Sequence, residues 1–224
     1  DVCSSDLHLS ARIPGPNEHF LINPVGTLFE EMTASCLVKV DIDGNILSES
    51  EFGINPAGYT IHSAVHMGRK DAGCVMHTHT AAGLGVATQK SGLLPLTQMA
   101  LAVIAQTSYH SYEGPAFDLG ERDRLIEDLS SNNVLILRNH GLLTVGKTVA
   151  EAFVWMFRAE RACRFQLSFQ QAGAPAQEIS KAVQDISIER SKKAISASGH
   201  RPIGQFEWPA LLRKLNRENP GYDE

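Results

Sequence analysis

The segment AGCVMHTHT, residues 72–80, joins a short apolar run to two histidines that are separated by a single residue. A short apolar run of this kind is typical of a buried β-strand. Side chains alternate between the two faces of a strand, so His77 and His79 should point the same way. Two imidazoles on one face near a strand end can hold a divalent metal, although such a pair can equally form only local hydrogen bonds.

A third metal ligand has to come from elsewhere in the chain. His140 is the best candidate, because it lies in a turn directly after the apolar run VLILR, and sites in α/β sheets gather at strand ends. Three neutral histidines and a water molecule make a catalytic type of zinc site. A rival pair, His62 and His66, has the i, i+4 spacing of metalloprotease helices but no intervening glutamate, which favours a packing or supporting role.

Outward from this segment, strands and helices alternate along the chain. Strands are predicted at 19–26 and 72–80, a hairpin at 35–47, two strands within 133–146, and helices at 56–71, 97–106, 121–131, 148–173, 177–197 and 207–217. A capping box of Thr148 and Glu151 begins the clearest helix. This order predicts one α/β domain over 8–173, with 174–224 as its helical C-terminal extension. Residues 1–7 are polar and aperiodic, and are interpreted as an artefactual or truncated N-terminus.

Composition excludes several classes of protein. The 224 residues are 43% hydrophobic and 20% charged, which is enough for one large domain with a substantial core. A net charge of -5 provides no basic field for nucleic acid or an anionic membrane. No apolar run approaches the roughly 20 residues of a membrane span. Four scattered cysteines favour a reducing compartment, so a soluble cytoplasmic protein is expected.

Three stretches carry a resemblance to a known family: HLSARIPGPNEHFLINPVGTLFEEMTASCLVKVDIDGNIL, FGINPAGYTIHSAVHMGRKDAGCVMHTHTAAGLGVA and VLILRNHGLLTVGKTVAEAF. With HTHT and NHG in this order, the chain resembles the class II aldolase/adducin family over about residues 8–173. The resemblance implies a three-layer α/β/α sandwich around a central, mainly antiparallel sheet. It also implies a homotetramer with the active site near a subunit interface, and a metal held by His77, His79 and His140.

The chain departs from the sugar-phosphate aldolases of that family at two places. Those enzymes carry a glutamate, both ligand and acid/base, at the position of Gly58. They hold the substrate phosphate with small hydroxyl residues where this chain has Val25, Pro56 and Ala57, none of which donates a side-chain hydrogen bond. A phosphorylated substrate is therefore not expected, and the loops look like the adducin-like branch.

The expected function is a metal-dependent lyase, of decarboxylase or aldolase type, that acts on a small non-phosphorylated hydroxy- or keto-acid. Such a metal, Zn²⁺ in the first place and Mn²⁺ as the alternative, polarises a carbonyl and stabilises an enolate. Without a base at Gly58, decarboxylation is favoured over retro-aldol cleavage. The alternative is a non-catalytic adducin-like binding or scaffold module whose metal site is structural or vestigial.

Two further segments supply candidate site residues. The segment YHSYEG, residues 109–114, is predicted as a loop after a helix. In it Tyr112 or His110 could deliver a proton, and Glu113 could orient water or replace the missing carboxylate. A surface turn with packed aromatic rings is the alternative. Arg12 could pair with a substrate carboxylate, or form a structural salt bridge instead.

Overall fold

A mixed β-sheet lies at the centre of the computed structural model, which describes residues 7–224. Within these residues the sheet has seven strands in the order β3-β2-β1-β4-β7-β6-β5. The strands are β1 His8–Arg12, β2 Phe20–Ile22, β3 Val38–Val40, β4 Cys74–Thr78, β5 Thr107–His110, β6 Val134–Leu137 and β7 Gly141–Gly146. Neighbouring strands are antiparallel except β5 and β6, which are parallel. The predicted, mainly antiparallel sheet is confirmed.

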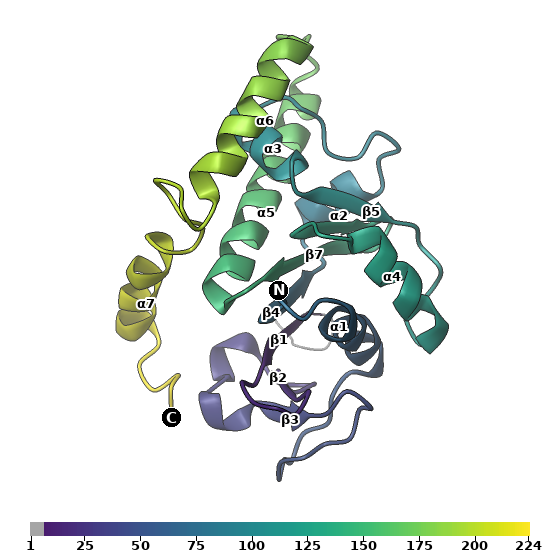
Figure 1. Cartoon of the computed structure of the whole chain (residues 1–224), viewed down its shortest axis with the longest axis vertical. Helices are drawn as coiled ribbons and strands as arrows, with labels where there is room; N and C mark the ends of the chain where they lie inside the picture. The colour runs from purple at the N-terminus through teal and green to yellow at the C-terminus, as the bar shows by residue number, and fades with distance from the viewer. Residues whose placement is uncertain (1–6) are drawn as a thin grey trace.

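Helices cover both faces of this sheet (Figure 1). They are α1 Pro56–Gly68, α2 Ala81–Ala87, α3 Gln98–Ile104, α4 Arg122–Leu129, α5 Val149–Ala172, α6 Lys181–Ile195 and α7 Glu207–Glu218. One core contains side chains of α1 and α4 with Val75 and Leu143 of the sheet. The other contains side chains of α2, α3 and α5 with Met76 and Leu142. Two cores on opposite faces confirm the α/β/α sandwich.

The alternation of β4 decides which face its polar residues share. Cys74 and Met76 belong to the core under α5, whereas Val75 belongs to the core under α1. His77 follows Val75 by two residues, so it faces the α1 side. The strand is buried as far as His77, and its polar end therefore opens next to α1.

Local sequence sets the ends of the two helices that matter most for the site. Asn55 begins α1, because its Oδ1 accepts the N–H groups of Ala57 at 2.9 Å and Gly58 at 3.3 Å. Thr148 begins α5 in the same way, with its Oγ1 accepting the N–H of Glu151 at 3.2 Å. The Asn55 cap fixes the first turn of α1, which lines the same pocket as the end of β4.

Several elements differ from the prediction. The expected hairpin over 35–47 is reduced to β3 and an isolated bridge between Val40 and Ile46, and β1 and α2 were not predicted. Residues 109–114 do not form a loop throughout, since Tyr109 and His110 are the last residues of β5. Their strand conformation comes from parallel pairing with β6, in which His110 is opposite Leu137. The residues of β5 lack a clear apolar alternation, so a partner distant in sequence makes the strand.

The C-terminal helices follow the predicted positions and contact the rest of the fold. In Figure 1, α6 and α7 lie on the side of the molecule away from α4, where α6 contacts α3 and α7 contacts α5. The ring of Trp208 in α7 lies 5.9 Å from that of Phe153 in α5, and Tyr222 accepts the backbone N–H of Ala34. The division into one domain and an extension stays a prediction. The interpretation of residues 1–7 stays a prediction, because residues 1–6 lie outside the described residues.

No helix within residues 7–224 combines the length and the apolar character that a membrane span requires.

Candidate metal centre

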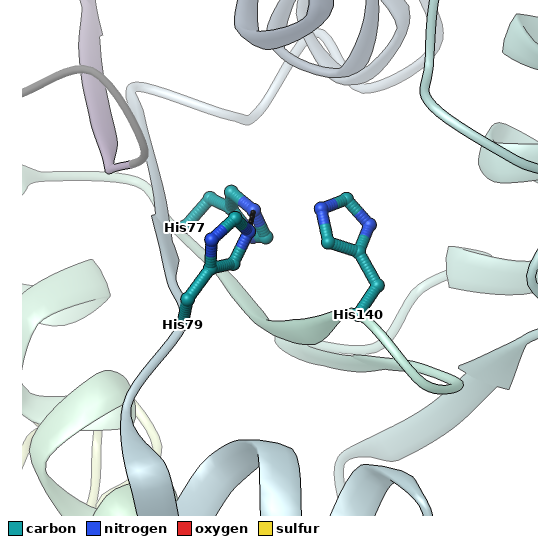
Figure 2. A group of neighbouring side chains, drawn as sticks. All are labelled: His77, His79 and His140. Atoms are coloured by element: carbon teal, nitrogen blue, oxygen red, sulfur yellow. Dashed lines mark hydrogen bonds between the residues drawn. The ribbon is translucent and has the colours of Figure 1, made fainter.

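Three histidines from two neighbouring strands meet at one end of the sheet (Figure 2). His77 belongs to β4 and His79 follows it, while His140 lies in the turn between β6 and β7. Because β4 pairs with β7, residue 140 is brought beside residues 77 and 79. One nitrogen of each ring lies within 4.8 Å of the others, slightly wider than the roughly 4 Å expected for ligands of one ion. The convergence expected from spacing is present in the structure.

The turn Asn139-His140-Gly141 has a steric explanation for each flanking residue. Asn139 has a φ of 58°, a left-handed conformation that asparagine tolerates better than most residues. A Cβ on Gly141 would lie 2.4 Å from the backbone oxygen of Thr78 and 3.0 Å from the His79 ring. Glycine therefore lets β7 approach β4, and the turn presents His140 to the other two rings.

Burial keeps the imidazoles of His77 and His140 unprotonated near neutral pH. Burial lowers the pKa of His77 well below its ordinary value, and the adjacent His140 and His79 lower it further. Burial, followed by the proximity of His79, lowers the pKa of His140 to about 4. An unprotonated ring nitrogen carries the lone pair that a metal ion needs.

The tautomer of His77 favours metal binding as well. Its Nδ1 lies 3.0 Å from the carbonyl oxygen of Leu142, which can only accept, so Nδ1 carries the proton. Its Nε2 then presents a lone pair toward Nε2 of His79, 2.7 Å away. Three converging imidazoles, of which His77 is oriented by this hydrogen bond, fit a divalent metal with an open coordination position.

The triad forms one wall of a pocket of about 240 Å³. The opposite walls come from the first turn of α1, from the segment 112–116 and from His8 at the start of β1. Among the described residues that line this pocket, none is an aspartate, glutamate, lysine or arginine.

Of the three candidate catalytic residues, Tyr112, His110 and Glu113, only Tyr112 lines this pocket. The Tyr112 ring lies 6.4 Å from that of His140 and is 53% exposed, so it stands at the mouth of the pocket. Glu113 is paired with Arg124, with Oε1 2.8 Å from Nε, and this hydrogen bond lowers the pKa of Glu113. The structure does not bring Glu113 to the triad.

His110 is also engaged elsewhere. Its Nδ1 lies 2.7 Å from Oδ2 of Asp128, and its Nε2 lies 3.1 Å from Oε1 of Glu121. Both ring nitrogens thus tie the end of β5 to α4 and the turn before it. His110 does not line the pocket, so the expectation that it delivers a proton to substrate finds no support in this geometry.

Arg12 lies at the opposite end of β1 from His8. Its Nε donates to the carbonyl of Ala72 at 3.2 Å, and its Nη2 donates to the carbonyl of His66 and, at 3.5 Å, to that of Arg69. The guanidinium therefore binds the C-terminal end of α1 rather than the pocket. Neither substrate pairing nor a salt bridge describes what the structure gives this residue.

His62 and His66 have the supporting role expected of them. Both are completely buried, and Ser10 lies between them, with its Oγ 2.6 Å from Nδ1 of His62 and 2.8 Å from Nε2 of His66. The hydroxyl bridges the two rings, so they hold α1 against β1.

His8 is the site residue that sequence reasoning missed. It pairs with His77 across β1 and β4, with the two rings nearly parallel and 6.2 Å apart. It also fills the space beside Gly58, where a Cβ would lie 2.7 Å from three atoms of the His8 ring. Only the register between β1 and β4, which are far apart in sequence, places it there.

Comparisons with known proteins agree with this architecture. The model of the class II aldolase and adducin N-terminal domain matches residues 6–167. A Pseudomonas aeruginosa protein named as an aldolase class 2 protein is 52% identical over 221 residues, covering 96% of this chain and 82% of that protein. Rat alpha-adducin is 39% identical over 228 residues, covering 96% of this chain but only 30% of the adducin.

Solved structures show the same likeness. A Pseudomonas syringae protein of the aldolase II superfamily superposes with a TM-score of 0.90 at 46% identity, covering 100% of this chain and 88% of that one. The L-fuculose 1-phosphate aldolase of Glaciozyma antarctica superposes with a TM-score of 0.81 at 26% identity, covering 98% of this chain and 84% of the aldolase. The chain therefore belongs to the class II aldolase/adducin family.

Proposed function

We propose that this chain is a metal-dependent carbon–carbon lyase that acts on a small, non-phosphorylated hydroxy- or keto-acid. The observation that carries the proposal is the convergence of His77, His79 and His140, all within 4.8 Å, on the wall of a pocket. A divalent metal there, Zn²⁺ in the first place and Mn²⁺ as the alternative, would polarise a carbonyl oxygen and stabilise the negative charge that develops on it. The triad would hold this metal through neutral imidazoles.

The composition of the pocket supports the substrate class. A phosphate dianion needs several donors, and no lysine or arginine is among the described lining residues. The N–H groups of Ala57 and Gly58 already donate to Asn55. A pocket of about 240 Å³ also favours a small substrate.

We assign proton transfer at this site to Tyr112, which lies at the mouth of the pocket. Tyr112 is the ionisable side chain of the segment 109–114 that reaches the pocket, and its hydroxyl can donate a proton to a carbanion or receive one from a hydroxyl group. Release of CO₂ needs a proton donor but no base for a substrate hydroxyl. No carboxylate is found among the described residues that line the pocket, which favours decarboxylation over retro-aldol cleavage.

Metal content is the direct test. The purified protein, stripped with a chelator and reloaded with Zn²⁺, should retain about one ion per chain, and His140→Ala should lose it, because a three-histidine site needs every ligand. His200→Ala, which changes an exposed histidine outside the pocket, is the matched control. Wild-type protein without bound metal would remove the proposal.

The reaction is tested on the loaded protein with a panel of hydroxy- and keto-acids. Release of CO₂ identifies a decarboxylase, whereas aldehyde and keto products without CO₂ identify an aldolase. Both activities should disappear in His140→Ala.

The second candidate is a non-catalytic binding module. It is favoured by the 39% identity to rat alpha-adducin across 96% of this chain. Stoichiometric metal without turnover of any acid in the panel would support this alternative, with the metal site serving structure alone.

A further inference from the structure

His8 forms the wall of the pocket next to the triad. It begins β1 directly opposite His77, and its ring is only 6% exposed. A second ring, that of His62, lies edge-on at 5.9 Å on the side of α1. His8 is therefore held between a candidate metal ligand and the buried His62–Ser10–His66 row.

Gly58 and His8 occupy one space. A Cβ at position 58 would lie 2.7 Å from Cγ, Cδ2 and Nδ1 of His8, closer than real side chains approach. These atoms belong to a ring confined by His62 and His77, so it cannot move aside easily. Gly58 is in a helix with ordinary backbone angles, so glycine is needed here for space and not for conformation.

His8 is one of few polar side chains that line the pocket, and the positions of the others indicate its role. Outside the triad, the described polar side chains that line it are His8, Asn55 and Tyr112. Asn55 caps α1 through its Oδ1, and Tyr112 stands half exposed at the mouth. His8 is thus the buried polar side chain that faces a ligand bound at the triad.

Charge favours an anionic ligand at this place. Imidazole ligands carry no negative charge and no carboxylate of the described residues lines the pocket, so these residues would not compensate the charge of a bound dication. An anion that coordinates the metal supplies this compensation at short range. Among the described lining residues outside the triad there is one buried donor and no cationic side chain, so a carboxylate suits the site better than a phosphate.

We propose that His8 is the anion-recognition residue of this pocket, and that its ring N–H donates a hydrogen bond to the carboxylate of a ligand held at the triad. Gly58 is the small residue that makes room for it. The inference rests on the proposed metal-dependent function and adds to it a residue that selects carboxylate ligands.

The test uses the whole chain loaded with Co²⁺, whose visible absorption reports on ligands that enter the metal's coordination sphere. Oxalate is the carboxylate probe, and inorganic phosphate and ethylene glycol are the comparison probes. Wild-type protein should bind oxalate more tightly than either. His8→Phe, which keeps a ring and removes both nitrogens, should weaken oxalate binding by about tenfold or more while Co²⁺ content is unchanged.

A matched variant separates hydrogen bonding from packing. His8→Gln retains an N–H donor and should keep most of the affinity for oxalate. If His8→Phe binds oxalate as tightly as wild type, or if phosphate binds as tightly as oxalate, the inference is wrong although the metal site stands. If wild-type protein binds no Co²⁺, the proposed function and this inference fall together.

The packing of the pair is tested independently of any metal. Gly58→Ala should lower the melting temperature in the wild-type background and much less in the His8→Ala background, since the added methyl group then meets no ring. Equal effects in the two backgrounds would show that His8 does not fill this space.

Discussion

His66 is a buried imidazole that lies outside the proposed metal site, and it connects pH to folding. Burial, followed by the charge of Arg12, lowers the pKa of His66 to about 4, from an ordinary value of 6.5. The unfolded chain therefore binds a proton at a higher pH than the folded chain. The stability due to neutral His66 is fully present above pH 6.5 and is lost as the pH falls toward 4.

The size of this effect can be measured by urea unfolding at several pH values between 7.5 and 4. A shift of this size corresponds to about 3 kcal/mol for one buried group. His66→Gln should therefore show a smaller loss of stability across the same window than wild type. His200→Gln, at an exposed position, is the control and should behave as wild type. Parallel pH profiles for wild type and His66→Gln would contradict the expectation.

At the scale of single residues, sequence spacing was enough to find the candidate metal triad but not the residues around it. His77 and His79 share a face because strands alternate, and His140 lies at a strand end, so local rules suffice. His8 lies beside the triad only because β1 pairs with β4. Glu113 is hydrogen-bonded to Arg124 and does not line the pocket. Such long-range contacts leave no mark in the local pattern.

At the scale of elements, Arg12 connects the end of β1 to the end of α1. Its guanidinium donates to three backbone carbonyls near that helix end, those of His66, Arg69 and Ala72. Arg12→Ala should destabilise the fold by about 1–3 kcal/mol, because buried carbonyls lose charged donors. Thermal or urea unfolding measures this loss.

A structural role for Arg12 also predicts what does not change. Oxalate binding to the Co²⁺-loaded Arg12→Ala protein should equal that of wild type at a temperature where both are folded. Arg213→Ala, on the exposed surface of α7, is the matched control for loss of a charge. A weakened affinity for oxalate with an unchanged melting temperature would contradict the structural role and indicate that Arg12 binds the ligand.

The elements themselves were predictable to different degrees. The ends of α5 follow from Thr148 and from Gly173, which has the left-handed φ of 64° that stops a helix. The strand β5 was missed, since it depends on its parallel partner β6 rather than on its own residues.

At the scale of the whole molecule, one face of α5 remains apolar and exposed. Phe157 and Phe165 of α5 are 48% and 39% exposed, and the guanidinium of Arg161 lies over both rings. Phe206, the residue directly before α7, is 60% exposed. Exposed aromatic clusters of this kind mark interaction surfaces. We expect a homotetramer, with a mass in light scattering of four times the 24.4 kDa of the chain.

Phe157→Asp places a charge in this face and should shift the mass toward that of smaller assemblies. Circular dichroism should remain that of a folded chain, because the side chain is half exposed. A wild-type protein that runs as a monomer at micromolar concentration would contradict the expectation.

The contact between His8 and Gly58 also restricts the order in which the site can evolve. Any side chain that appears at position 58 while His8 is present meets the ring at 2.7 Å. A change from histidine to a smaller residue at position 8 must therefore come first, and only then can position 58 gain a functional group such as a carboxylate. Relatives with a residue other than glycine at the position of Gly58 should accordingly carry a smaller residue at the position of His8, so the two positions change as a pair.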